Sequence, residues 1–252
     1  MKNKKIISLI PNLLTSLALL MGLLAIFNLY QFPIDSQNLF SNSKNFWWSC
    51  IFIYAAAFLD FVDGKIARLL NQDSEFGMHY DSFSDLISFG LAPSLLAYNV
   101  YLFQFEKFGL ICCIFYILCV ALRLARFNTL DHDEKENYFI GLPSPMAAGL
   151  IVSIILISFK FNFTLDVTSP LLLLIIPLSG LLMVGNVIFI KKLPNRNISR
   201  FNFLIIISIL SLGILTNIEI GSFIFFYFYL FFSFFKYFVF KLKKKSKEIK
   251  NS

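Results

Sequence analysis

The sequence predicts an all-α fold, a polytopic integral membrane bundle of about eight transmembrane helices. Of the 252 residues, 58% are hydrophobic, and the mean hydropathy is +0.73. Apolar segments recur along the chain at close to the roughly 20 residues that a helix needs to cross a bilayer. Basic residues gather at the ends of these segments. This composition excludes a soluble domain.

Eight apolar segments follow one another along the chain. They run about Ile7–Tyr30, Phe46–Arg68, Gly77–Phe103, Phe108–Phe127, Pro143–Phe159, Ser169–Ile190, Phe201–Thr216 and Ile220–Phe240.

Several of the expected helix ends have a clear local signal. Pro11 suits a first helical turn, where its missing N–H needs no partner. The polar stretch from Leu69 to Phe76 predicts a turn between the second and third helices. Gly141 to Pro143 predicts the start of the fifth helix, and the basic residues between Lys191 and Arg200 separate the sixth segment from the seventh.

The basic residues also predict how the bundle is oriented. With eight spans, both termini lie on the same side of the membrane. That side holds 19 of the 22 basic residues, and the other side holds Lys44, Lys107 and Lys160. Because basic loops stay in the cytoplasm, we expect a multi-pass protein of the cell (inner) membrane with both termini cytoplasmic. The net charge of +7 thus reflects topology, and no nucleic-acid partner is expected. Residues 1–240 would form a single membrane-embedded domain, and 241–252 a basic cytoplasmic tail that contacts anionic membrane lipids.

Four aspartates interrupt the apolar sequence near the cytoplasmic ends of the second and third segments. Asp60 and Asp63 are three residues apart and share a helical face. Gly77, Asp81 and Asp85 are each four apart and form one stripe on the next helix. A single aspartate at such a place would usually cap a helix or lie in a solvated loop. Charges at membrane depth are costly, so a cluster of four indicates a functional site.

The residue types around this cluster indicate metal and phosphate binding. Carboxylate oxygens suit Mg²⁺, Mn²⁺ or Ca²⁺ better than zinc, and four of them could hold one or two ions on a pyrophosphate. Gly64 and Ala67 have almost no side chain, so a ligand can approach the backbone there. Arg68 offers a planar fork suited to phosphate.

The same residues resemble the signature of the CDP-alcohol phosphatidyltransferases, D-x2-D-G-x2-A-R-x8-G-x3-D-x3-D. The matching residues are Asp60, Asp63, Gly64, Ala67, Arg68, Gly77, Asp81 and Asp85. Every fixed position of the signature is present at its proper spacing. The resemblance implies a six-helix core, with two added helices here, and it implies homodimers.

Three further stretches resemble the phosphatidylserine synthase branch of this family: Ser88–Pro93, Arg123–Asn128 and Gly141–Gly149. The resemblance implies transfer of the phosphatidyl group from CDP-diacylglycerol to L-serine, with release of CMP. It assigns metal binding to Asp60, Asp63, Asp81 and Asp85, and makes Asp85 the base that takes the proton of the serine hydroxyl.

Two other pairs of residues have both a structural and a functional interpretation. Asn12 and Thr15 are natural helix caps, but many members of the family begin with a similar Pro-Asn-x-x-Thr, which favours a place near the nucleotide. Arg123 and Arg126 share a helical face and either anchor the helix end in the cytoplasm or clamp a substrate carboxylate or phosphate. The resemblance makes them candidates for binding serine.

The ligand set implied for CDP-diacylglycerol comprises Asn12, Thr15, Asp60, Asp63, Gly64, Ala67, Arg68, Gly77 and Asp81.

Two alternatives stay open. A sibling enzyme could use glycerol 3-phosphate, inositol phosphate or choline as the acceptor. A transporter could also carry intramembrane carboxylates, although the clustering of these aspartates at one interface argues against a transport path.

Overall fold

The third rod of the bundle is a helix whose pitch changes just after Asp85. In the computed structural model, which describes residues 9–30, 43–70, 74–129, 138–185, 188–190 and 217–233, this rod runs without a break from Glu75 to Val100. It consists of α4 (Glu75–Asp85), the π-helical turn η1 (Leu86–Leu91) and α5 (Ala92–Val100). Serine 74 caps its start, because its side chain accepts a hydrogen bond from the Gly77 N–H at 3.0 Å.

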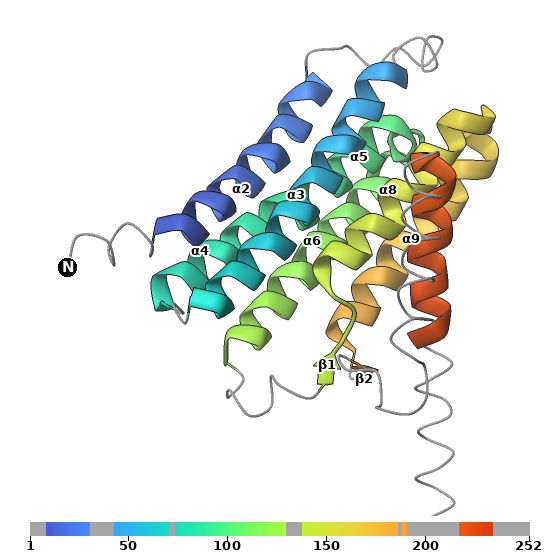
Figure 1. Cartoon of the computed structure of the whole chain (residues 1–252). Helices are drawn as coiled ribbons and strands as arrows, with labels where there is room; N and C mark the ends of the chain where they lie inside the picture. The colour runs from blue at the N-terminus through green and yellow to red at the C-terminus, as the bar shows by residue number, and fades with distance from the viewer. Residues whose placement is uncertain are drawn as a thin grey trace, which may run out of the picture.

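The other described helices lie beside this rod, and the long helices from α2 to α9 alternate in direction (Figure 1). They are α2 (Leu9–Tyr30), α3 (Ser43–Leu70), the short 3₁₀ helix η2 (Leu102–Phe105), α6 (Glu106–Thr129), α8 (Ser144–Phe161), α9 (Leu165–Val184) and a last helix, Ile218–Ser233. The predicted turn between the second and third helices is shorter than expected, since α3 continues to Leu70 and α4 already begins at Glu75.

A proline and a tyrosine explain the change of pitch in η1. Pro93 has no N–H to give to the carbonyl four residues earlier, that of Phe89. The hydroxyl group of Tyr116 in α6 donates to this carbonyl instead, at 3.0 Å. The Phe89 carbonyl, freed by Pro93, therefore has a hydrogen-bond partner on the neighbouring helix α6.

Helix α2 packs very closely against this rod. A Cβ atom on Gly22 would lie 2.4 Å from Ser88 Oγ, so only glycine fits at this crossing. The hydroxyl groups of Ser84 and Ser88 both donate to backbone carbonyls of α2, those of Thr15 and Ala18, each at 3.3 Å. Small residues let helix backbones approach closely in membrane proteins. This contact brings the start of α2 beside the acidic stripe of α4.

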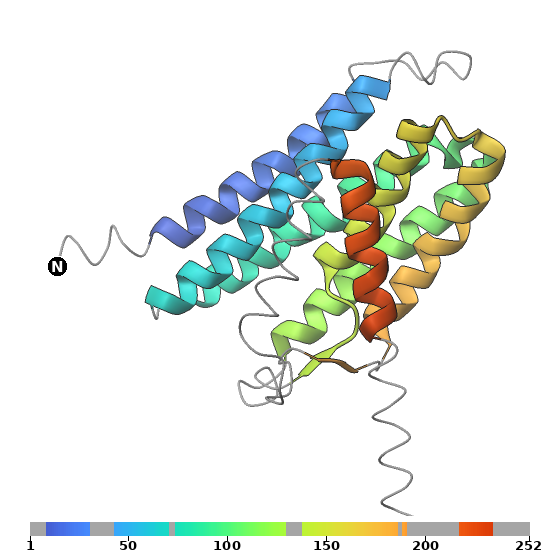
Figure 2. The same ribbon diagram turned by 45° about the vertical axis from the view of Figure 1, so that its right-hand side comes forward.

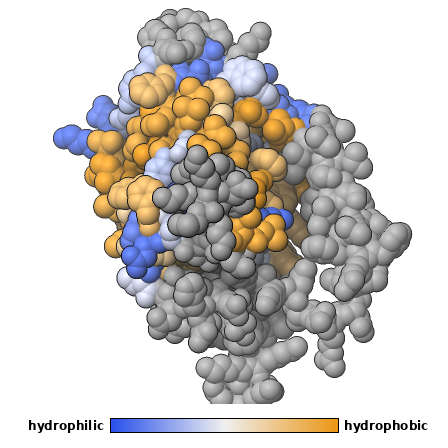
Figure 3. All heavy atoms as spheres, turned by 60° about the vertical axis from the view of Figure 1, so that its left-hand side comes forward, coloured by the Kyte–Doolittle hydropathy of each residue, from blue (hydrophilic) through white to orange (hydrophobic). Residues whose placement is uncertain are grey.

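The outer surface of the bundle is strongly apolar. Exposed large side chains include Phe27, Leu118, Phe108 and Leu174, on α2, α6 and α9. Figure 3 shows hydrophobic residues over most of the face that is not grey. Lipid-facing helices have this property, because lipid tails are as apolar as a protein core.

Four of the described helices are long and apolar enough to cross a membrane: Pro11–Tyr30, Leu102–Thr129, Ser144–Phe161 and Leu165–Val184. They correspond to the first, fourth, fifth and sixth predicted segments. The second and third segments are helical, as α3 and the Glu75–Val100 rod. The seventh lies outside the described residues, and the eighth is described from Ile218 to Ser233. A total of about eight spans stays a prediction.

The sixth predicted helix is shorter than expected. Helix α9 ends at Val184, and Ile188–Ile190 forms a strand, β2, that pairs antiparallel with β1, Tyr138–Ile140. The all-α class is confirmed, and this pair of three-residue strands is a small addition to it. An apolar run cannot by itself distinguish a strand from the end of a buried helix. Tertiary contacts decide it here, since the Arg126 guanidinium binds the carbonyls of Met183 and Val184 at the end of α9.

The last helix, Ile218–Ser233, crosses in front of the bundle in Figure 2. Its Phe226 ring packs onto Gly149 of α8, where a Cβ atom would lie 2.2 Å from the ring, and stacks on Tyr54 of α3. At one end of this helix Glu219 forms a 3.6 Å salt bridge with Lys160 and accepts a 3.3 Å hydrogen bond from the Trp47 indole. These contacts fix the last helix against α3 and α8.

Candidate active site

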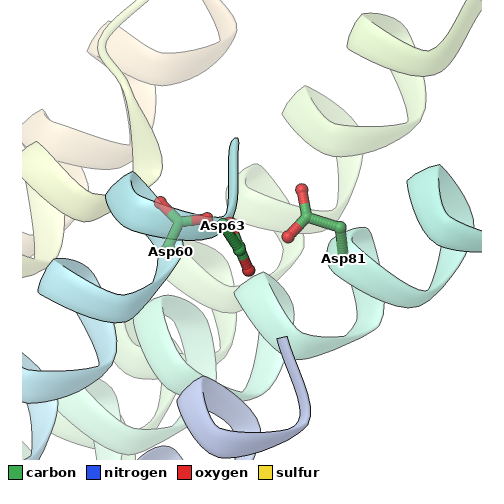
Figure 4. Close-up of side chains that lie close together, drawn as sticks. All are labelled: Asp60, Asp63 and Asp81. Carbon is green, nitrogen blue, oxygen red and sulfur yellow. The ribbon is translucent and has the colours of Figure 1, made fainter. Parts of the chain in front are cut away.

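Three of the four aspartates meet between α3 and α4. Carboxylate oxygens of Asp60, Asp63 and Asp81 all lie within 4.8 Å of one another. Figure 4 shows these three side chains, which come from the two helices and point into the space between them. Asp63 is only 4% exposed, and the other two are half-buried. Two neighbouring helices thus present three of the four aspartates to one another.

This acidic triad has the properties of a cation site. Three carboxylates so close together repel one another, and partial burial removes the water that would screen them. The Thr15 hydroxyl donates to Asp63 at 2.9 Å, which satisfies one oxygen but supplies no positive charge. The donor atoms are carboxylate oxygens, which suit Mg²⁺, Mn²⁺ and Ca²⁺. The residues present therefore fit a hard divalent cation.

The fourth aspartate lies beside the triad and has further partners of its own. Asp85 is buried, and its carboxyl group adjoins that of Asp60. The hydroxyl group of Ser144, in the first turn of α8, donates to Asp85 Oδ2 at 3.2 Å. Arg123 Nη1 of α6 in turn donates to Ser144 Oγ at 3.1 Å. Asp85, Ser144 and Arg123 thus form a buried chain, the acid–serine–arginine chain, at the side of the triad.

The two predicted serine-binding arginines have different surroundings. Arg123 is 8% exposed and, besides its bond to Ser144, its charge acts on Asp85 and Asp60. Its Nε has no hydrogen-bond partner among the residues that the structure describes. Arg126 donates to Val184 O at 2.8 Å and to Met183 O at 3.2 Å. A buried N–H without a partner is costly, so Arg123 has capacity to bind a further acceptor group.

The remaining predicted ligand residues surround the triad at the ends of α2, α3 and α4. Asn12 Oδ1 lies 3.3 Å from the position of a Cβ atom on Gly77, so these two residues are neighbours. A Cβ atom on Gly64 would meet no atom of the described residues within 4 Å outside its own helical turn, which leaves open space there. Ala67 is half-buried, and the side chain of Arg68 lies outside the described residues.

Spacing in the sequence did not reveal Ser144 as part of the site. It lies within the Gly141–Gly149 stretch, but the flanking prolines predict only the start of a helix. Which way a first-turn serine points depends on the helices packed around it. The bonds from Ser16 to Tyr80 (2.9 Å) and from Asn128 to Ser82 (2.9 Å) were missed for the same reason.

A comparison with known protein families decides the assignment. The sequence model described as CDP-alcohol phosphatidyltransferase matches residues 8–192, which is most of the chain and includes the triad and the acid–serine–arginine chain. The chain belongs to the CDP-alcohol phosphatidyltransferase family. It is therefore a transferase, and the family together with the four candidate spans makes it a multi-pass membrane enzyme rather than a transporter.

Three relatives of the chain have the same name. The chain is 35% identical over 214 residues to the CDP-diacylglycerol–serine O-phosphatidyltransferase of Helicobacter pylori, covering 84% of each chain. The enzyme of the same name from Bacillus subtilis is 39% identical over 153 residues, which is 61% of this chain and 77% of that protein. The one from Methanocaldococcus jannaschii is 39% identical over 147 residues, 57% of this chain and 64% of that protein.

Proposed function

We propose that the chain transfers the phosphatidyl group of CDP-diacylglycerol to the hydroxyl group of L-serine, which yields phosphatidylserine and CMP. The observation that carries this proposal is the pairing of the acidic triad with a buried base and a buried arginine on its flank. The names of the relatives support the choice of serine as the acceptor.

Asp60, Asp63 and Asp81 would hold the divalent metal, with Asp85 adjoining Asp60. Mg²⁺ or Mn²⁺ is the proposed ion, and Ca²⁺ suits the same oxygen ligands. Such an ion, when bound, neutralises pyrophosphate charge and stabilises CMP as the leaving group. Thr15 keeps the Asp63 carboxylate in position through its 2.9 Å hydrogen bond.

The nucleotide end of CDP-diacylglycerol would lie over the start of α4 and the end of α3. The open space beside Gly64 accommodates it, Ala67 adds little bulk, and the neighbouring Asn12 and Gly77 border the same region. Arg68 is proposed to contact the phosphates, for which its planar fork is suited. The two acyl chains would stay in the bilayer beside the apolar outer surface.

Asp85 is proposed as the general base. It accepts the proton of the serine hydroxyl while the serine oxygen forms a bond to the phosphorus of the phosphatidyl group. The bond between that phosphorus and the oxygen of CMP breaks, and CMP leaves with the bonding electrons. Arg123, with its unsatisfied Nε, would bind the serine carboxylate, because a guanidinium pairs well with this group. Arg126, already bonded to α9, would hold the framework beside it and is the second candidate for the carboxylate.

The surroundings of the reaction follow from the same proposal. The enzyme is expected to lie in the inner membrane with about eight spans, and with its termini, basic tail and active site facing the cytoplasm, where serine and CMP are soluble. The last helix and the tail extend beyond the residues matched to the family. A homodimer is proposed from the family resemblance alone.

The test is CMP release by the purified protein in detergent with CDP-diacylglycerol and Mn²⁺ or Mg²⁺, with serine, glycerol 3-phosphate, inositol phosphate and choline added in turn. Serine alone should drive release, and EDTA should abolish it. Asp85→Asn should lower the rate at least about 100-fold, as loss of a general base does. Release with another alcohol would keep the family reaction but reject serine. No release with any alcohol would reject the proposed activity.

A further inference from the structure

We propose that Ser144 is a positioning residue that sets the geometry between the base Asp85 and the anion-binding Arg123, and so selects acceptors that carry an anionic group next to the reacting hydroxyl. This inference rests on the proposed function and adds a residue to which nothing in the sequence signature assigns a role. Its basis is the two hydrogen bonds of Ser144 Oγ, 3.2 Å to Asp85 Oδ2 and 3.1 Å from Arg123 Nη1.

The direction of these two bonds is fixed by chemistry. A guanidinium can only donate, so Ser144 Oγ must accept from Arg123. The single hydroxyl proton is then available for Asp85, whose carboxylate accepts it. All three side chains are buried, with Ser144 fully so, which keeps competing water away from the chain. Hydrogen bonds between charged groups and a buried hydroxyl are stronger than those between neutral partners.

Ser144 does not cap its own helix. A serine caps a helix from the N-cap position, where its oxygen accepts hydrogen bonds from the first free N–H groups, but here Pro143 has that position and Ser144 is the first helical residue. Helix α8 begins after Pro143 without a side-chain cap in this described segment, and the Ser144 hydroxyl is directed to α4 and α6 instead. Its contacts therefore join three helices, and stability of α8 alone does not account for them.

The contacts also leave reactive capacity on both partners. Oδ2 of Asp85 accepts from Ser144, and a carboxylate with two oxygens has further lone pairs with which it can take a proton. With Nη1 of Arg123 held by the same hydroxyl, its buried Nε has no partner among the described residues. Serine carries its carboxylate and hydroxyl on adjacent carbons, so a fixed separation of Asp85 and Arg123 suits this acceptor. An alcohol without an anionic group could use only the base.

The experiment compares Ser144→Ala and Ser144→Thr with Ser153→Ala in the full-length enzyme. Ser153 is a matched control, because it is a fully buried serine of the same helix whose hydroxyl, among the described residues, bonds within the helix, to Leu150 O at 2.9 Å. We expect Ser144→Ala to lower kcat/KM for serine about 10- to 100-fold, the range for a hydrogen bond to a charged group. Ser144→Thr, which keeps the hydroxyl, and Ser153→Ala should stay within about threefold of the wild type.

Two further readouts separate positioning from general damage. Binding of Mn²⁺, followed by electron paramagnetic resonance, should be unchanged in Ser144→Ala, because the residue does not contact the triad. The preference for serine over ethanolamine, which lacks the carboxylate, should decrease in this variant. Equal activity of Ser144→Ala and Ser153→Ala would overturn the inference, and so would loss of Mn²⁺ binding in Ser144→Ala or an unchanged preference for serine.

Failure of the proposed function would be seen differently, as absence of serine-dependent CMP release by the wild type. The positioning role is then judged by infrared spectroscopy on protein with ¹³C-labelled aspartate. The carboxylate band that disappears in Asp85→Asn should shift in Ser144→Ala and not in Ser153→Ala. An unshifted band would overturn the inference whatever the acceptor is.

Discussion

The hydroxyl group of Thr15 in α2 lies 2.9 Å from Asp63 Oδ2 in α3, across 48 residues of sequence. Both side chains are buried. The same hydroxyl lies 3.1 Å from the carbonyl of Pro11, so the threonine is held against its own helix while it contacts the triad. The first helix is therefore part of the site, and does not act only as a membrane anchor.

Replacing Thr15 by valine should weaken Mn²⁺ binding about tenfold or more. Valine has nearly the same shape but no hydroxyl, so the Asp63 carboxylate loses a hydrogen bond worth about 1.5–3 kcal/mol. The measurement is Mn²⁺ titration followed by electron paramagnetic resonance. Thr15→Ser keeps a hydroxyl and should bind the ion nearly as well as the wild type. Equal affinity of Thr15→Val and the wild type would show that this hydrogen bond does not orient Asp63.

Replacing Tyr116 by phenylalanine should lower both stability and activity. The change removes the hydroxyl that satisfies the Phe89 carbonyl and leaves a buried acceptor without its partner, at a cost of about 1–3 kcal/mol. We expect a melting temperature several degrees lower in detergent. CMP release should also fall, because the turn directly follows Asp85. Tyr30→Phe, at an exposed position, is the control. A variant with wild-type stability would show that the π-helical turn does not need this bond.

Replacing Gly149 by alanine should loosen the last helix. The added methyl group would lie 2.2 Å from the Phe226 ring, and overpacking of this kind costs about 1–3 kcal/mol. A scan of thermal unfolding should show a lower melting temperature for Gly149→Ala. Combining it with Phe226→Leu should cost less than the sum of the two single changes, because the smaller side chain relieves the clash. Strict additivity would mean that the last helix does not dock through this contact.

Much of the site could be predicted because its signals are local. Spacings of three and four residues place Asp60 with Asp63, and Asp81 with Gly77, on single helix faces whatever surrounds them. The polar stretch between the two helices makes them neighbours, so the meeting of the triad followed from the sequence. The surroundings of Asp85 did not follow from it, because they depend on Ser144 and Arg123, which lie far away in the chain.

Other features could not be predicted from local patterns. Arg123 and Arg126 share a face in sequence, yet one lies beside Asp85 and the other binds the end of α9. The apolar run to Ile190 was expected to be helical throughout, but part of it pairs as a strand with Tyr138–Ile140. Hydropathy indicates that a segment must be buried, but it does not determine which neighbouring segment satisfies its backbone hydrogen bonds.

By itself, the sequence determined the membrane class of this protein, its family and the four aspartates of its candidate site. These follow from composition and from short spacings that the helix period converts directly into shared faces. Only the tertiary structure decided which side chains complete the site: Thr15 on Asp63, Ser144 between Asp85 and Arg123, and Tyr116 on the turn after Asp85. The physical reason is that a hydrogen bond acts over about 3 Å, and helix packing alone brings residues from distant segments within that range.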